Sequence, residues 1–164
     1  MRNSKCPVPK EQQPTNEFLE LSNSFVFSWP KSNRRLSIVL ISIWFFTFFI
    51  FIFISSGSVY FEKNYIKYIL MSFFSSLSIP LLIILRLYLG WNHIFKRLTS
   101  EKVEYEESGW YDGQTWIKPL ALKEKESLIA TLEVKPILRN LIQIASIIST
   151  LLLLGILLFQ YAKF

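Results

Sequence analysis

The sequence has a single cysteine and a single histidine in 164 residues. One cysteine excludes a disulfide within the chain, and one cysteine with one histidine cannot complete a zinc site or an iron–sulfur cluster. The sequence also lacks a nucleophile elbow, a phosphate-binding glycine loop and a His–carboxylate metal motif. We therefore expect neither an enzymatic activity nor a metal centre built from this chain alone.

Charged residues are absent from two long apolar stretches, residues 36–54 and 141–159. As a helix, each stretch would measure about 28 Å, close to the hydrocarbon thickness of a bilayer, about 30 Å. A chain of 164 residues offers too little protein to bury two such helices in a soluble core. Both stretches are predicted to span a membrane.

A third apolar stretch, residues 68–90, contains Pro80 and several serines. Pro80 lacks a backbone donor and should kink the helix, and Ser76 and Ser78 are expected to help satisfy the freed carbonyl. Ser72 and Ser76 form a small-xxx-small pair that lets another helix approach closely. We expect a third span here, continuing as a helix to about residue 98.

Arg86 and Trp91 lie near the end of this third stretch. The Arg86 guanidinium can reach the headgroups as an interfacial anchor, and a buried ion pair is the alternative. Trp91 is expected to mark the membrane interface.

The distribution of basic residues indicates the orientation of the chain in the membrane. With three spans, thirteen Lys and Arg lie on the side of the N-terminus and the long loop, against three on the other side. The positive-inside rule then places the N-terminus in the cytoplasm or the stroma and the C-terminus on the opposite side. The stretch from Lys96 to Lys135 has seven basic against eight acidic residues, so the long loop has no nucleic-acid footprint. We expect a lipid bilayer as partner and no nucleic acid.

The first 35 residues are polar and rich in proline, without the apolar core of a signal peptide. They are also too acidic and too short to read as a transit peptide, which favours a protein made in its own compartment. Residues 6–14 should be extended, near polyproline II, and a short helix should follow with Thr15 or Asn16 as its cap. An aromatic run ending at Trp29 is expected to anchor the chain at the interface.

The long loop, residues 99–136, alternates β-formers with polar residues on both sides of Asp112-Gly113. That pair is typical of a type I′ turn and predicts a β-hairpin. Residues 120–134 predict an amphipathic helix that ends before Pro136. Its apolar positions include Leu122, Leu128, Ile129 and Leu132.

Two groups of side chains could bind a ligand. His93 could ligate haem iron or chlorophyll magnesium, or be an interfacial hydrogen-bonding ring, and Cys6 could supply a thiolate to haem or make a structural contact. The second group is acidic and could hold a hard cation or act in acid–base chemistry, or form a solvated face. It consists of Glu104, Glu106, Glu107 and Asp112.

Aromatic rings in the same loop favour a docking surface. Trp110, Tyr111 and Trp116 are residue types that commonly anchor protein interfaces. The alternative is that they pack on the helix after the hairpin or lie among the headgroups.

Five segments occur in a characteristic order: CPVPKEQQPTNEF, FSWP, RLYLGWNHIFKRL, EYEESGWYDGQTWIKP and VKPILRNL. Together they resemble the plastid and cyanobacterial family called hypothetical chloroplast reading frame thirty-six, whose plant members are named "conserved in the green lineage and diatoms". The resemblance implies a photosynthetic membrane, thylakoid or inner envelope, and no reaction.

The sequence therefore predicts an all-α integral membrane protein, with three transmembrane helices and a short β-hairpin and amphipathic helix in the stromal loop. The predicted order is a stromal segment (1–35), a span (36–54), a lumenal loop (55–67), a span (68–90), the stromal loop (99–136) and a span (137–161). The leading hypothesis is a non-catalytic accessory or assembly protein of a photosynthetic complex in a plastid membrane, with the thylakoid favoured. The alternative is a pigment-, haem- or metal-handling protein. The candidate partner-binding residues are Trp29, Arg86, Trp91, Tyr105, Glu106, Glu107, Gly109, Trp110, Tyr111, Asp112, Gly113 and Trp116.

Overall fold

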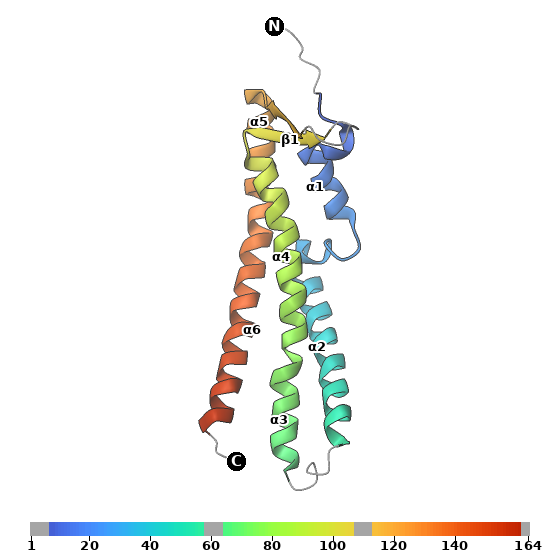
Figure 1. Cartoon of the computed structure of the whole chain (residues 1–164), viewed down its shortest axis with the longest axis vertical. Helices are drawn as coiled ribbons and strands as arrows, with labels where there is room; N and C mark the ends of the chain where they lie inside the picture. The colour runs from blue at the N-terminus through green and yellow to red at the C-terminus, as the bar shows by residue number, and fades with distance from the viewer. Residues whose placement is uncertain (1–6, 58–63, 107–112, 162–164) are drawn as a thin grey trace. The chain divides into compact units, whose positions relative to one another are not determined.

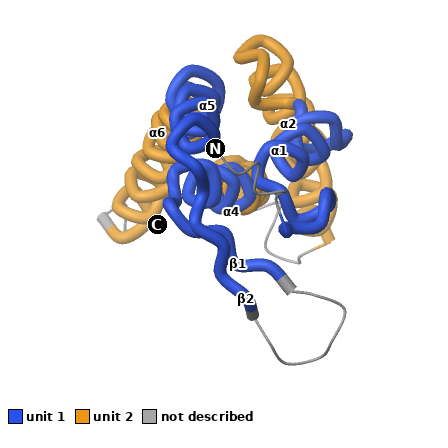
Figure 2. Tube along the Cα trace, turned by 90° about the horizontal axis from the view of Figure 1, so that it is seen from above, with its two compact units in different colours: residues 1–28, 89–138 blue, residues 29–88, 139–164 orange. Residues whose placement is uncertain are grey.

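A computed structural model of the chain describes residues 7–57, 64–106 and 113–161. The chain divides into two compact units, each built from two separate stretches of sequence (Figure 2). Unit 1 comprises residues 1–28 and 89–138, and unit 2 comprises residues 29–88 and 139–164. The candidate docking segments fall in unit 1, and most of the apolar sequence falls in unit 2.

Three helical segments are long and apolar enough to cross a membrane, at the three predicted places. They are Asn33–Ser56, Tyr65–Thr99 and Leu120–Gln160, with 24, 35 and 41 residues. At 1.5 Å per residue the two longer segments exceed the hydrocarbon thickness of a bilayer by about 20 Å or more. In Figure 1 they correspond to α2 (Asn33–Ser56), α3 (Tyr65–Ser76) with α4 (Ser78–Thr99), and α5 (Leu120–Ile129) continuing into α6 (Lys135–Tyr161).

The second segment is interrupted at Leu77, three residues before Pro80. Pro80 cannot donate to the carbonyl of Ser76, and the Thr47 hydroxyl of α2 lies 3.4 Å from that oxygen. The serines expected to satisfy this carbonyl bond elsewhere: Ser76 donates to Phe73 O at 2.8 Å and Ser78 to Ser75 O at 2.7 Å. The predicted role of these serines was therefore wrong, because a neighbouring helix supplies the donor.

Small residues bring the helices of unit 2 close together. The hydroxyls of Ser55 in α2 and Ser72 in α3 lie 3.2 Å apart, and Ser72 and Ser76 are both buried. A Cβ atom added to Gly155 of α6 would lie 2.5 Å from Cγ of Phe74 in α3. The small-residue contacts expected of the second span are confirmed.

The first described elements of unit 1 are the 3₁₀-helix η1 (Lys10–Gln12) and the helix α1 (Pro14–Asn23). The expectation that residues 6–14 are extended throughout was wrong, because η1 turns the chain. The predicted caps were also wrong: α1 starts at Pro14, whose fixed φ suits the first helical position, and Gln13 precedes it with extended backbone. Asn16 instead donates its side-chain amide to Lys10 O at 2.7 Å.

The predicted hairpin is confirmed. Strand β1 (Lys102–Glu106) pairs antiparallel with β2 (Gly113–Ile117), and Glu106 lies opposite Gly113. The turn is therefore not centred on positions 112 and 113 as predicted, because Gly113 already belongs to β2. Residues 107–112, which connect the strands, lie outside the described residues.

The helix after the hairpin does not end before Pro136. Between α5 and α6 a π-helical turn, η3 (Ala130–Val134), keeps the chain helical, with Lys135 N–H bonded to Ala130 O. Pro136 has no N–H for the carbonyl of Leu132, so the ordinary α-helical bond cannot form there.

Two of the four predicted apolar positions of this helix, Leu122 and Ile129, are half-buried. Leu128 and Leu132 are 58% and 72% exposed, whereas the buried positions are Glu126, Ala130 and Val134. Glu126 can be buried because Lys118 pairs with it, a contact that helical spacing does not reveal.

Candidate docking site around Arg97

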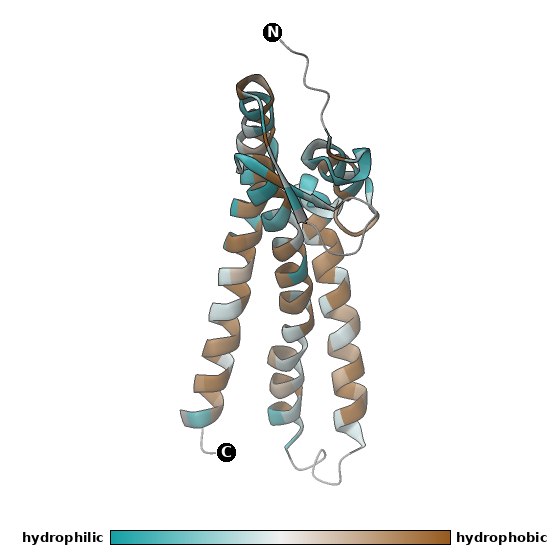
Figure 3. Cartoon of the chain, turned by 45° about the horizontal axis from the view of Figure 1, so that its top comes forward, coloured by the Kyte–Doolittle hydropathy of each residue, from teal (hydrophilic) through white to brown (hydrophobic). Residues whose placement is uncertain are grey.

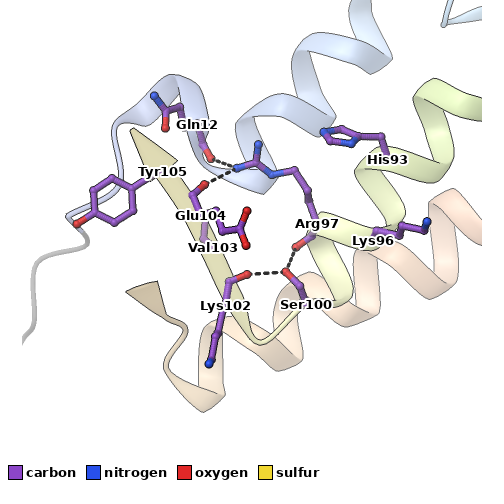
Figure 4. A pocket seen from close by; sticks show the side chains of 9 residues that line it. All are labelled: Gln12, His93, Lys96, Arg97, Ser100, Lys102, Val103, Glu104 and Tyr105. Atoms are coloured by element: carbon purple, nitrogen blue, oxygen red, sulfur yellow. Dashed lines mark hydrogen bonds between the residues drawn. The ribbon is translucent and has the colours of Figure 1, made fainter. Parts of the chain in front are cut away.

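Arg97, near the end of α4, joins three segments of unit 1 (Figure 4). Its Nη1 lies 2.7 Å from Oε1 of Glu17 in α1, and its Nη2 donates to Gln12 O at 2.9 Å. A longer contact of 3.4 Å runs from Nη2 to Glu104 O in β1. The planar guanidinium has several donors in fixed directions, so one side chain ties the N-terminal segment to both α4 and the hairpin.

Burial governs the electrostatics of Glu17. Burial raises the pKa of its carboxyl above the ordinary value, while the charges of Arg97 and His93 oppose that shift and the charge of Glu20 adds to it. Its second oxygen, Oε2, is buried without a hydrogen-bond partner among the described residues. The ion pair with Arg97 therefore does not fully offset the desolvation of this carboxylate.

A cavity of about 580 Å³ lies beside Arg97. Its rim has an excess of cationic side chains, and the imidazole of His93 is exposed there. Ser100 fixes the backbone at the base of the cavity by donating to Arg97 O at 3.0 Å and Lys102 O at 2.8 Å. The lining residues are Gln12, His93, Lys96, Arg97, Ser100, Lys102, Val103, Glu104 and Tyr105 (Figure 4).

An apolar cluster supports the hairpin side of this site. Val8 from the N-terminal segment packs with Val103 and Tyr105 of β1, and Trp116 of β2 packs against them. Val103 and Tyr105 share one face of β1 because side chains two residues apart point to the same side. The Tyr105 hydroxyl donates to Gln114 Oε1 at 2.7 Å, which links the two strands.

Trp91 is fully buried in unit 1. Its ring meets Phe18 of α1 edge-on, with centroids 6.1 Å apart. The next position upstream is equally tight, since a Cβ on Gly90 would lie 2.4 Å from Cε1 of Phe27. In this structure Trp91 therefore supports the packing of α1 on α4, and its predicted role in partner binding stays a prediction.

Lys118, which follows β2, forms a buried ion pair that sequence reasoning missed. Its Nζ lies 2.5 Å from Oε2 of Glu126, and both side chains are almost completely buried. The same ammonium donates to Arg97 O at 2.8 Å and to Leu98 O at 3.3 Å. These carbonyls belong to the last turn of α4, where a cation is favoured by the helix dipole. The only sequence signal was a lysine eight positions before a glutamate.

The structure brings some of the predicted site residues together and separates others. His93, Glu104 and Tyr105 line one cavity, whereas Trp29 and Arg86 belong to unit 2. Among residues 7–57, 64–106 and 113–161, no three His, Cys, Asp or Glu side chains are grouped closely enough to hold a metal ion. Glu106 and Gly113 face each other at the end of the described ladder. The predicted positions Cys6, Glu107, Gly109, Trp110, Tyr111 and Asp112 lie outside the described residues.

Comparisons with known proteins identify relatives along nearly the whole chain. The ycf36 protein of Porphyra purpurea is 39% identical over 164 residues, covering 97% of both chains. The ycf36 protein of Cyanophora paradoxa is 36% identical, covering 92% of this chain and 94% of the relative.

A longer relative is the Arabidopsis thaliana protein named "conserved in the green lineage and diatoms 27, chloroplastic". It is 34% identical over 97% of this chain, which spans 49% of that protein. No solved structure is significantly similar. The family model CGLD27-like, "Conserved in the green lineage and diatoms 27", matches residues 6–147. The chain therefore belongs to the CGLD27-like family.

Proposed function

We propose that this chain is a three-span plastid membrane protein that serves a photosynthetic complex as a non-catalytic accessory or assembly factor. It docks its partner through unit 1, on the stromal side. The plastid setting is supported by the name of the Arabidopsis relative, and membrane insertion by three apolar helices of sufficient length.

The observation that carries this proposal is the set of contacts made by Arg97. The N-terminal segment and the hairpin are far apart in sequence, and both carry motifs of the family resemblance. Arg97 binds Gln12 and Glu17 in the first and Glu104 in the second. A membrane-anchored chain that builds a folded polar unit from its N-terminal segment and the loop between two predicted spans has a preformed surface for a partner, which lowers the entropic cost of binding.

The side chains around Arg97 do not form a catalytic set. In the cavity, His93 and Glu104 come from α4 and β1, and no described side chain there is an activated nucleophile with a neighbouring base. Basic, acidic and aromatic groups on one surface are instead suited to a protein interface, where charge complementarity orients the partner.

The test uses the tagged full chain expressed in its own plastid membranes. After gentle solubilisation and native separation, we expect the chain to migrate with a larger complex. The variant Arg97→Ala should lose that migration, while Lys125→Ala, an exposed cation on α5, should keep it. Migration of the wild-type chain only as a free monomer, without a co-purifying subunit, would contradict the proposal.

A second candidate function is the handling of a pigment or haem, which the exposed His93 beside a 580 Å³ cavity favours. A neutral imidazole with open space beside it is a suitable axial ligand for haem iron. The purified chain would then absorb visible light, and His93→Ala would abolish the absorption. A colourless preparation contradicts this candidate and leaves the docking proposal untouched.

A further inference from the structure

Unit 2 contains a group of arginines without carboxylate partners. The described residues of unit 2 include no aspartate or glutamate. Four arginines, Arg34, Arg35, Arg86 and Arg139, are nevertheless exposed, and none forms an ion pair among the described residues. Their positive charges are therefore uncompensated within this part of the protein.

The four arginines lie at one level of the helix bundle in unit 2. Asn140 of α6 donates to Asn33 of α2 at 2.9 Å, which places the starts of these two helices side by side. Arg34 and Arg139 are sequence neighbours of these asparagines, so they lie within about one helical turn of the hydrogen bond.

A shared groove relates Arg86 to the same level. Leu40, Pro80 and Ile144 all line one apolar groove of unit 2. Each arginine lies on the side of its groove residue that faces the end of the bundle where Asn33 and Asn140 meet. Along the sequence, Arg35 is five residues from Leu40, Arg86 is six from Pro80 and Arg139 is five from Ile144. At 1.5 Å per residue, each of these arginines stands about 8 to 9 Å along its helix from that lining residue. We call Arg34, Arg35, Arg86 and Arg139 the arginine belt.

The belt lies near one end of each apolar stretch: Arg34 and Arg35 directly precede residues 36–54, Arg139 lies two residues before residues 141–159, and Arg86 lies four residues before the end of residues 68–90. In Figure 3 hydrophobic residues, drawn in brown, dominate the lower part of the helices of unit 2. A guanidinium at that depth extends its stem along apolar surface and places its charge among the lipid headgroups. Arginine binds phosphate and similar oxyanions through two parallel hydrogen bonds. A negatively charged leaflet attracts each basic side chain near its surface by roughly 1 kcal/mol.

We propose that the arginine belt is a binding site for anionic lipid headgroups, with a phosphate or sulfonate as the recognised group. This inference rests on the membrane insertion proposed above and is independent of partner docking by unit 1. The lipid supplies the negative charges that the described residues of unit 2 lack, and it surrounds the bundle at the level where α2, α4 and α6 leave the hydrocarbon.

The experiment compares phosphatidylglycerol with phosphatidylcholine of the same acyl chains, using the purified full chain in neutral detergent. Native mass spectrometry counts the lipids that remain bound. We expect a preference for phosphatidylglycerol that weakens with added salt, and a loss of about fivefold in affinity for each of Arg86→Gln and Arg139→Gln. Lys67→Gln removes one positive charge at the opposite end of the same helix segment and is expected to change little.

Circular dichroism of each variant checks that its helices are intact. Equal binding of the two lipids, or unchanged phosphatidylglycerol binding in the Arg86→Gln/Arg139→Gln double variant, would overturn the inference. It would also be overturned if the double variant kept its lipid but lost a co-purifying protein, because the belt would then bind an acidic partner. In any of these cases a wild-type chain that remains in the membrane fraction and migrates with a complex still supports the proposed function.

Discussion

Arg97 Nη1 and Glu17 Oε1 lie 2.7 Å apart, although one residue lies near the end of α4 and the other belongs to the polar N-terminal segment. The contact fixes α1 against the last turns of α4. Glu17 is partly buried, and its second oxygen has no hydrogen-bond partner among the described residues, so its protonation is linked to the stability of the candidate site.

Stability of unit 1 should fall as pH rises through the range in which Glu17 ionises. The folded pKa of Glu17 is raised above 4.5, so between these two values the folded state binds more protons than the unfolded state. The contribution of Glu17 to stability is therefore greatest below pH 4.5 and decreases until the folded pKa is passed.

Thermal unfolding in detergent at a series of pH values measures this dependence. The variant Glu17→Gln should lack this component, because it has no ionisable group at the buried position. Glu124→Gln, an exposed glutamate of unit 1 on α5 whose charge does not contribute to the Glu17 shift, should behave like the wild-type chain. A pH profile of Glu17→Gln that matches the wild type would show that another group is responsible.

Breaking the buried pair of Lys118 and Glu126 should destabilise unit 1 strongly. Lys118→Met leaves a buried carboxylate without its cation, at a cost of about 3 to 5 kcal/mol. The double variant Lys118→Met/Glu126→Leu should recover part of the loss, because an apolar pair of similar volume removes the unpaired charge. Full recovery is not expected, since Lys118 also bonds the carbonyls of Arg97 and Leu98.

Denaturant unfolding of the four members of this double-mutant cycle gives the coupling energy. A Lys118→Met variant as stable as the wild type would contradict the assignment of this pair as a structural element of unit 1.

Substituting Gly155 should loosen the packing of α6 on α3. The added Cβ of Gly155→Ala would lie 2.5 Å from the Phe74 ring, so the helices must separate or the ring must move, at roughly 1 to 3 kcal/mol. Gly57→Ala is the matched control, because among the described residues its Cβ would meet Ile54 O at 3.5 Å, an ordinary contact.

Melting temperatures of both variants in the same detergent provide the comparison. Adding Phe74→Leu should restore part of the stability of Gly155→Ala, since the clash is with that ring. Equal melting temperatures for Gly155→Ala and Gly57→Ala would contradict close packing at this crossing.

Labelling of the single cysteine should report the orientation of the N-terminus. In sealed vesicles with the stromal face outward, a membrane-impermeant maleimide is expected to label Cys6 without permeabilisation. In a Cys6→Ser/Phe164→Cys chain, which carries its only cysteine at the C-terminus, labelling should require detergent. The reverse pattern would contradict the distribution of basic residues as the determinant of topology.

Local chemistry predicted several elements correctly. Uncharged runs of nineteen residues predicted α2 and α6, because hydrophobic length is a property of a segment by itself. Alternating β-formers likewise predicted β1 and β2, and the helix after Pro14 was expected within two residues of its observed start. The hairpin register was misplaced, because the type I′ turn preference of Asp-Gly did not outweigh the pairing of Gly113 with Glu106.

The composition and order of the residues alone determined the three apolar segments, the excess of basic charge at one end of them and membership of the family. Each of these properties belongs to a single segment or is a sum over residues, so none depends on a contact between residues far apart in sequence. The tertiary structure decided which polar groups pair with one another. The Thr47 hydroxyl donates to the Ser76 carbonyl that Pro80 leaves without an N–H, Arg97 pairs with Glu17, and Lys118 pairs with Glu126 on the buried face of α5. Two of these contacts join residues far apart in sequence, and the third joins residues eight positions apart. Desolvation makes each polar group depend on a partner that no local pattern names.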